Sequence, residues 1–507
     1  MVVAEGARPA PAPTPLRKRI RRQAVVIVHG MGEQRPGDTL NRFVGVGLRP
    51  EGPGQTRFYY SRPDTVTDSF EARRFLAPRT GERPQTEFFE YHWAHLMQGN
   101  RLDDLWPTFR RMLLRPRQVP SGLKVVWFLA WVVIVVGGWA VAWGPLSGIA
   151  ATGEGWFEAA LRALFGGGVL AAAVSYLFAR VLGRSVTRSF VDVVRYLDTS
   201  PRSYEARRAI RKGLVDLLTG LHDKTLFGEP RYQRIVVVAH SLGAYIAYDA
   251  ISYLWGEMNH QRRRGDKPPL DGLPEAELAA SRLPAASSQP GGKPPPAELA
   301  AYRRAQRRLW LGLGGQGNRW RVSDLVTVGT PMYFADRLYT RDRAAFDKRV
   351  RSGELPTCPP ITDPVRPDPP DPETSPDSAT VAEAMATPTA IPRFTWRWNR
   401  RVLHESAPFA VVRWTNLWFP HRLGLGDWFG GPLGPLYGRG IRDIEVIGNT
   451  TGRWGWLSGR RIPAIAHARY FRYPDDSADE SVTSLLWEAM DLELGSFQVP
   501  SDVDLEE

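Results

Sequence analysis

The chain has 507 residues, enough for a large core with insertions, and its 43% hydrophobic and 23% charged residues are ordinary for a globular protein. Cys358 is the only cysteine, which excludes an intrachain disulfide and metal sites built on several thiolates, and which fits a reducing, cytoplasmic setting. The net charge of +13 is spread along the chain without a nucleic-acid-binding motif, so we expect an anionic membrane surface rather than nucleic acid as its partner.

The first hundred residues predict a tail followed by strands. Residues 1–22 are rich in Pro and Ala and end in a basic run, which predicts a disordered tail or, alternatively, a contact with anionic headgroups. Ala24–Val28 is a short β-branched run typical of a buried strand, and it is too short for the apolar region of a signal peptide. Thr56–Tyr60 and Thr86–His92 are predicted to be further strands, so residues 23–106 form the first part of a folded domain.

Residues 107–185 are predicted to be an inserted pair of transmembrane helices. Residues 125–143 carry no charge, and a second apolar run extends over residues 163–182, so each is about as long as the twenty residues that span a bilayer core. Basic residues flank both outer ends, and Glu154 and Glu158 lie in the connection, which predicts that both ends face the cytoplasm. The alternative is a pair of buried helices in a large soluble protein.

Residues 186–495 are predicted to complete the domain. A helix is expected over Tyr204–Leu221 and another at Ser481–Leu494, with several strands between them. The expected strands are Ile235–Val238, Val322–Val328, Ala410–Leu417 and Ile441–Ile447. Two low-complexity inserts, 261–299 and 354–393, are not expected to pack, and 496–507 is expected to be an acidic tail. Strands alternating with helices predict the α/β class with a mostly parallel sheet.

The segment from Ile235 to Ala244 carries the strongest signal for chemistry. A β-branched strand runs into Ala239-His240-Ser241-Leu242-Gly243, and an apolar helix is predicted to follow from Leu242. A sharp strand-to-helix turn exposes a serine hydroxyl above the sheet and aims the next N–H at the same space. Small residues two positions before and after the serine allow strand and helix to pass closely. We therefore predict Ser241 as a nucleophile; the alternative is a serine that only caps the helix.

A second motif, His29-Gly30-Met31-Gly32, follows the first predicted strand. Gly30 and Gly32 would let the backbone turn and present an N–H to a developing oxyanion. We therefore predict the backbone N–H groups of Met31 and Leu242 as the two donors of an oxyanion hole, with Gly243 as a third motif glycine. Alone, a His-Gly pair after a strand is a common loop.

These motifs resemble those of the α/β-hydrolase superfamily, specifically its lipase- and esterase-like members with a His-Gly-x-Gly loop. The resemblance rests on residues 29–32, on residues 239–243, where Ala239 replaces the usual glycine, and on Gly329-Thr330-Pro331 after the next strand. It covers roughly residues 23–105 and 186–475. It implies an α/β-hydrolase fold and a catalytic triad in the chain order Ser, acid, His.

The resemblance places the general base in a loop after the last strand, and His467 is the histidine found there, since His404 and His421 precede that strand. The acid is predicted to be Asp427, whose Asp-x-x-Gly-Gly loop resembles that of some relatives. Asp427 lies far from the end of the preceding strand, so its loop must double back. Asp443 is the alternative acid.

Together these features predict a membrane-anchored serine hydrolase. We expect it to cleave a carboxylic ester of a lipid or another apolar acyl substrate through an acyl-enzyme, with no metal and no organic cofactor. The alternatives are a catalytically idle membrane interaction module and an acyltransferase that uses the same triad. A composition rich in Arg, Pro, Ala and Trp is typical of a high-GC bacterium, which predicts the inner membrane with the catalytic domain in the cytoplasm. The sequence predicts neither the acyl chain nor the oligomeric state.

Overall fold

The structure is a computed structural model of the whole chain. The residues that it describes are 20–30, 36–50, 58–64, 73–81, 83–97, 115, 119, 124, 127–128, 131–132, 135, 193, 195–197, 201–260, 270, 272–284, 293–340, 342–361, 394–397, 400–421, 426–446, 466–467, 470–471 and 480–497.

An eight-stranded sheet forms the centre of the described structure, with the order β12-β11-β8-β7-β1-β4-β3-β2. Its strands are β1 (Arg22–Val28), β2 (Tyr60–Pro63), β3 (Arg73–Ala77), β4 (Gln85–Tyr91), β7 (Arg234–His240), β8 (Val322–Val328), β11 (Arg413–Trp418) and β12 (Arg442–Glu445). The strands from β12 to β4 are parallel, and β3 and β2 add an antiparallel edge. The α/β class predicted from the sequence is therefore confirmed, and the parts of the chain on either side of residues 107–185 share one sheet.

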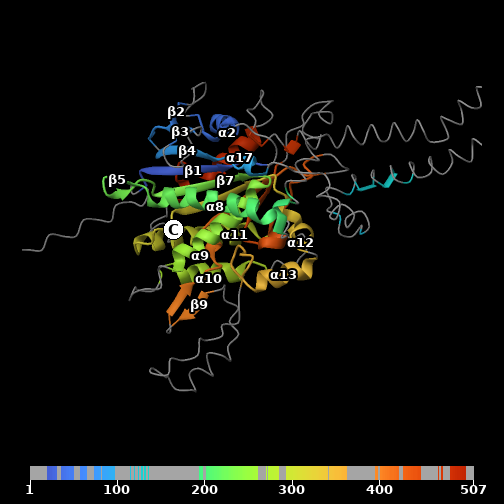
Figure 1. Cartoon of the computed structure of the whole chain (residues 1–507). Coiled ribbons are helices and arrows are strands. Elements are labelled where there is room, and N and C mark those ends of the chain that lie inside the picture. Colours follow the sequence, from blue (N-terminus) through green and yellow to red (C-terminus); the bar gives the residue numbers. More distant parts are fainter. Residues whose placement is uncertain are drawn as a thin grey trace, which may run out of the picture.

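Helices cover both faces of this sheet (Figure 1), with α2 and α17 on one side and α8, α9 and α11 on the other. In the described part of the chain, the helices of eight or more residues are α2 (Asp38–Gly47), α8 (Pro201–Asp223), α9 (Gly243–His260), α10 (Leu273–Arg282), α11 (Pro296–Gly315), α13 (Arg343–Arg351) and α17 (Glu480–Met490). The shorter ones are η1 (Ala94–Met97), η6 (Pro331–Phe334), α12 (Ala335–Leu338), η7 (Pro408–Ala410), α15 (Gly434–Tyr437) and η9 (Gly495–Phe497).

Burial on both faces explains why the central strands are continuous apolar runs. In β1, Val26 and Val28 pack in the core on the α8–α9 side, whereas Val25 and Ile27 pack in the core on the α2–α17 side. All four are fully buried, and burying such a side chain stabilises the fold by roughly 1.5–3 kcal/mol. Parallel strands enclosed in this way lose the alternation of half-exposed strands.

The sheet order places a change of direction at β1. From β1 the chain continues through α2 to β4 on one side, whereas β7, β8, β11 and β12 follow one another on the other side. Helix α2, which follows β1, and helix α9, which follows β7, pack on opposite faces of the sheet. In open α/β sheets, ligands bind outside the carboxyl ends of the strands at such a point of reversal. The ends of β1 and β7 meet there, and these are the two strands that precede the predicted motifs.

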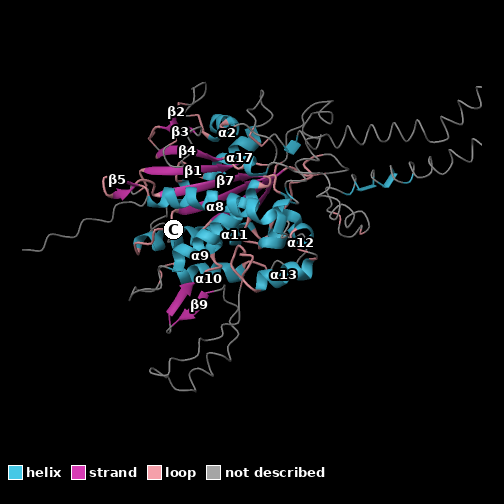
Figure 2. Cartoon of the chain, in the orientation of Figure 1, coloured by secondary structure: helices cyan, strands magenta, loops and turns pink. Residues whose placement is uncertain are grey.

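Two small hairpins lie outside the main sheet. One pairs β5 (Thr225–Leu226) with β6 (Glu229–Pro230), and the other pairs β9 (Phe394–Arg397) with β10 (Arg400–Leu403). Figure 2 shows β9 away from the central strands. Asn259 of α9 donates to the carbonyl of Leu403 at 2.7 Å, which fastens the second hairpin to the domain.

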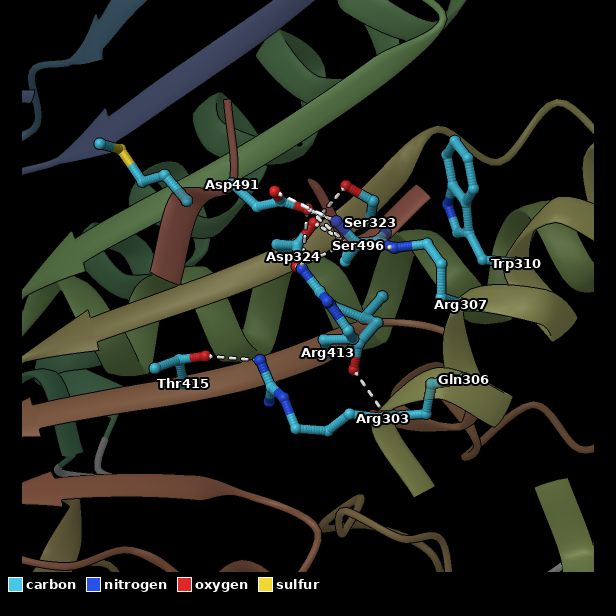
Figure 3. A network of polar contacts seen from close by, with 12 residues as sticks. Arg303, Gln306, Arg307, Trp310, Ser323, Asp324, Arg413, Thr415, Asp491 and Ser496 are labelled. Atoms are coloured by element: carbon cyan, nitrogen blue, oxygen red, sulfur yellow. Dashed lines mark hydrogen bonds and ion pairs between the residues drawn. The ribbon is translucent and has the colours of Figure 1, made fainter. Parts of the chain in front are cut away.

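A buried ionic cluster at the amino ends of the strands, formed by Arg234, Arg307, Asp324, Arg413 and Asp491, holds the segment after α17 on the sheet. Figure 3 shows Arg307, Asp324, Arg413 and Asp491 of this group. The three guanidiniums approach the Asp324 carboxylate to 2.7, 3.0 and 2.7 Å. Burial alone would raise the pKa of Asp324, but these arginines hold it well below its usual range. Arg234 also donates to the Asp491 carbonyl at 2.8 Å. We call this group the Asp324 cluster.

Most expected elements are confirmed within a few residues, but the two low-complexity inserts are partly wrong. Within 261–299, α10 is an amphipathic helix whose Leu273 and Ala276 join the core, and α11 begins at Pro296. The periodic small apolar residues of α10 bury well, although proline and charge dominate the composition around it. At the start of 354–393, Leu355 and Cys358 are also buried in the core; residues 362–393 lie outside the described part.

Three expected boundaries also move. The strand expected over Thr56–Tyr60 is β2, which begins at Tyr60. At the amino end, Ile20 is buried and β1 begins at Arg22, because Arg22 already pairs with Gln85 of β4. At the carboxyl end, Phe497 is buried, and the Arg307 guanidinium lies 4.0 Å from its ring centroid. The folded domain therefore reaches into both segments expected to be tails.

Among the residues that the structure describes, no helix combines the length and the apolar character needed to cross a membrane. The expected spans 125–143 and 163–182 lie outside the described residues, apart from helical positions of the first. Those positions are Trp127, Phe128, Trp131, Val132 and Val135.

Candidate active site

The turn between β7 and α9 carries Ser241 in a strained conformation. Its φ of 54° lies in the left-handed region, which a residue with a Cβ adopts rarely. The Ser241 N–H donates to the carbonyl of Val328 at the end of β8, at 3.0 Å, which fixes the turn against the neighbouring strand. A Cβ at Gly243 would lie 2.5 Å from the Val28 carbonyl oxygen and 2.6 Å from that of His29. Only glycine therefore lets α9 start against the end of β1.

A continuous hydrogen-bonded chain joins Ser241, His467 and Asp427. The Nε2 atom of His467 lies 2.8 Å from Ser241 Oγ, and its Nδ1 atom lies 3.0 Å from Asp427 Oδ1. A carboxylate oxygen only accepts, so Nδ1 carries the proton and Nε2 is free to accept from the serine hydroxyl. Ser241 and Asp427 are buried, and the His467 side chain is 14% exposed. The structure thus brings together the three residues that the sequence singled out, over separations of 226 and 40 residues.

The Asp427 carboxylate is held in place on both oxygens. Oδ1 also accepts from the Phe429 N–H at 2.9 Å, and Oδ2 accepts from the Tyr470 hydroxyl at 2.8 Å. The loop doubles back as expected at Gly426, whose φ of 97° suits glycine and whose backbone lies against Pro420. Burial raises the pKa of Tyr470 well above its ordinary value, so its hydroxyl remains a donor.

The alternative acid, Asp443, belongs to a different set of contacts. Its Oδ1 accepts from the Asn416 amide at 2.7 Å and from the Leu433 N–H at 2.9 Å, and its Oδ2 accepts from the Gly434 N–H at 2.7 Å. Burial raises its pKa. Asp443 therefore fastens the loop after Asp427 to β11, and Asp427 is the carboxylate that meets His467.

The loop after β1 approaches the serine closely. A Cβ at Gly30 would lie 2.9 Å from the Ser241 Cβ, so this position requires glycine. His29 is buried and stacks on Trp93 at 5.1 Å between ring centroids, and the Trp93 indole N–H donates to the His29 carbonyl at 3.1 Å. Burial lowers the pKa of His29 to about 4, so the ring is uncharged. Met31 and Gly32 lie outside the described residues.

Leu242 occupies the place expected for the other oxyanion donor. It is buried directly after Ser241 and directly before Gly243, the first residue of α9. Its N–H therefore lies at the amino end of that helix, where backbone donors and the helix dipole favour negative charge.

Two residues that the sequence analysis did not assign also belong to this site. His240 donates from Nε2 to the carbonyl of His467, at 2.9 Å, and Tyr470 bridges Asp427 and the N–H of Phe419. Their positions in the sequence indicate these roles only weakly: His240 directly precedes the nucleophile, and Tyr470 follows the base by three residues. Neither contact has a sequence pattern of its own.

The described residues contain no group of three or more His, Cys, Asp or Glu side chains arranged to hold a metal ion. The polar side chains around Ser241 are instead two imidazoles, one carboxylate and one phenol. Such a set is suited to proton transfer. No protein-family model matches the chain, and neither the curated proteins nor the solved structures contain a match to it.

Proposed function

We propose that this chain is a serine hydrolase of the α/β-hydrolase type that cleaves a carboxylic ester through Ser241, His467 and Asp427. The observation that carries the proposal is the hydrogen-bonded chain from Ser241 Oγ through His467 to Asp427, which starts at a serine held at φ 54°. A serine that merely capped α9 would need neither a histidine at 2.8 Å nor a carboxylate behind that histidine.

The reaction follows from this geometry. His467 Nε2 takes the hydroxyl proton as Ser241 Oγ attacks the acyl carbonyl, and Asp427 stabilises the imidazolium through Nδ1. The proton then passes to the leaving alcohol, which departs and leaves an acyl-enzyme. A water enters, His467 takes its proton, and attack on the acyl carbon releases the acid and restores Ser241.

The oxyanion of each tetrahedral intermediate is assigned to the backbone N–H groups of Leu242 and Met31. The close approach of Gly30 to Ser241 supports this assignment for the loop that continues into Met31. Preorganised donors of this kind are strong in a dry site, and the loss of one costs roughly 3 kcal/mol of transition-state stabilisation.

The substrate is proposed to be a lipid or another apolar acyl ester that reaches the enzyme from a membrane. The support is the pair of long apolar runs with basic flanks, 125–143 and 163–182. Val119, just before the first run, accepts a hydrogen bond from Arg337 of α12 at 3.0 Å. The chain reaches α12 from Gly329 through η6, and Gly329 lies beside the triad, since an added Cβ there would meet Asp427 Oδ2 at 2.9 Å.

Hydrolysis of p-nitrophenyl esters of graded chain length by detergent-solubilised protein tests the proposal. Ser241→Ala is expected to abolish turnover. Ser252→Ala is the matched control, because this serine also lies in the α9 region but donates to the Tyr248 carbonyl. Equal turnover by both variants would refute the assignment. An added alcohol distinguishes hydrolysis from acyl transfer: a hydrolase releases the free acid, whereas an acyltransferase also forms the ester of the added alcohol.

The membrane part is tested separately by cell fractionation. We expect the chain to remain with membranes after washing in high salt and in carbonate, because two spanning helices are not released by either. Recovery in the soluble fraction of a detergent-free lysate would overturn the anchor and leave the hydrolase proposal intact.

A further inference from the structure

His240 lies between three parts of the candidate site. It directly precedes Ser241, its Nε2 lies 2.9 Å from the backbone oxygen of His467, and a Cβ at Gly30 would lie 2.7 Å from its Nδ1. The ring is partly buried, and its centroid lies 4.8 Å from that of His467 and 5.6 Å from that of Phe471. One imidazole thus touches the nucleophile's strand, the loop after β1 and the loop of the base.

The contacts determine the protonation state of this ring. A carbonyl oxygen only accepts, so the His240 Nε2 must carry a proton. Burial, with a further contribution from His467, lowers the pKa of His240 to about 3, so the ring carries only one proton over the physiological range. A neutral donor holds the loop without placing a positive charge beside the imidazolium that forms on His467 during the reaction.

The base is attached at few other points among the described residues around it. Its ring meets Asp427 and Ser241, and Tyr470, three residues later, anchors to Asp427 and to the Phe419 N–H. These contacts fix the ring and the far end of the turn. The bond from His240 fixes the backbone of His467 itself, and it does so from the residue next to the nucleophile.

We propose that His240 is a positioning residue that sets the distance between Ser241 Oγ and His467 Nε2 by holding the His467 carbonyl. The inference rests on the proposed function and deepens it. A displacement of about 1 Å between reacting groups lowers the rate by about 10²-fold. The rate of the chemical step is therefore expected to depend on the Nε2–H of His240, although His240 touches no substrate.

Two variants separate positioning from packing. His240→Gln carries an amide N–H at the place of Nε2, whereas the shorter side chain of His240→Asn reaches only the place of Nδ1. We expect His240→Asn to lower kcat by roughly 10- to 100-fold with KM within about twofold, and His240→Gln to stay within about threefold of wild type. His222→Gln is the matched control, since burial also lowers the pKa of His222 and leaves its ring uncharged, but His222 bonds to Leu218 and Arg321 at the amino end of β8.

If wild type is active, equal kcat values for the two folded His240 variants would overturn the inference, whether both are as active as wild type or both impaired. A readout independent of turnover is the ¹⁵N spectrum of histidine-labelled protein. It is expected to show a protonated Nε2 on His240, and a change of the His467 ring signals in His240→Asn but not in His240→Gln. If wild type has no activity yet these spectral changes occur, the proposed function fails and the positioning role stands. Unchanged His467 signals in His240→Asn would refute the role.

Discussion

Replacing Asp427 by asparagine tests the triad without changing the volume of the side chain. In the native site both carboxylate oxygens accept, from the Phe429 N–H and His467 Nδ1 on one side and from the Tyr470 hydroxyl on the other. An amide offers one acceptor only. The Tyr470 oxygen already accepts from Phe419 at 2.8 Å, so an amide N–H directed at Tyr470 competes with that bond. The other amide orientation directs an N–H at His467 and favours the wrong tautomer.

The expected loss follows from the tautomer. With the proton on Nε2, His467 no longer accepts from Ser241, and the same substitution in a serine protease with this triad lowers kcat by about 10⁴-fold. That factor corresponds to about 5.4 kcal/mol of transition-state stabilisation. Steady-state ester hydrolysis is the assay, with circular dichroism and a melting curve as checks on folding. The loss is expected in kcat with little change in KM.

Asp443→Asn is the comparison, because Asp443 is also a carboxylate held by several hydrogen bonds but accepts only from Asn416, Leu433 and Gly434. We expect it to reduce stability, with a fall in kcat below about tenfold. A folded Asp427→Asn protein with kcat within tenfold of wild type would refute the reasoning. So would a loss in Asp443→Asn as large as that in Asp427→Asn.

Three further predictions concern stability. Burial lowers the pKa values of His29, His222 and His240 to about 4, 4 and 3, so between pH 6.5 and about 4 the unfolded chain binds protons that the folded chain does not. As pH falls through this range, the free energy of unfolding should decrease by about 1.4 kcal/mol per pH unit for each histidine. Denaturant unfolding at several pH values measures this dependence, and His222→Gln should make it less steep; an unchanged dependence on pH in that variant would contradict the prediction. Asp324→Asn leaves three buried arginines without their shared carboxylate and should lower the free energy of unfolding by roughly 3–5 kcal/mol; a change under about 1 kcal/mol in urea unfolding would be inconsistent. Gly243→Ala should destabilise by about 1–3 kcal/mol and lower activity, because its Cβ meets two backbone carbonyls, whereas Gly314→Ala in α11 has nothing within 4 Å and should be neutral or stabilising in the same melts.

The central strands and the serine turn were predictable because their patterns are local. Ile235–Val238 is a β-branched run, and Ser241 with Gly243 fits a turn whose steric demands are strict. His467 was predictable through chain order alone. Asp427 was preferred to Asp443 only through the resemblance of its loop, because both carboxylates lie between β11 and His467 in the chain, as the order Ser, acid, His requires. Only the fold shows that Asn416 donates a hydrogen bond to Asp443 and that Gly426 turns the loop of Asp427 back toward His467.

Other features depend on contacts between distant residues and leave no trace in a local window. The Asp324 cluster joins residues from β7, α11, β8, β11 and the carboxyl-terminal segment, and arginines at such positions are easily taken for surface charge. Helix α10 lies in segment 261–299, whose overall composition is typical of a segment that does not pack. The helical spacing of Leu273, Ala276 and Ala280 is apparent only within the ten residues of the helix itself. The anchoring contact of His240 joins residues 227 apart, so its role follows only from the fold.

The most direct test of the central claim is labelling of detergent-solubilised protein with a fluorophosphonate, read by intact mass and peptide mapping. Wild type and the His222→Gln control are expected to gain one adduct on Ser241, while His467→Ala reacts far more slowly and Ser241→Ala not at all. The reason is that only a serine whose proton is accepted by a neighbouring base attacks the probe at a useful rate. A folded wild-type protein that gains no adduct, or an adduct that persists in Ser241→Ala, would contradict the account.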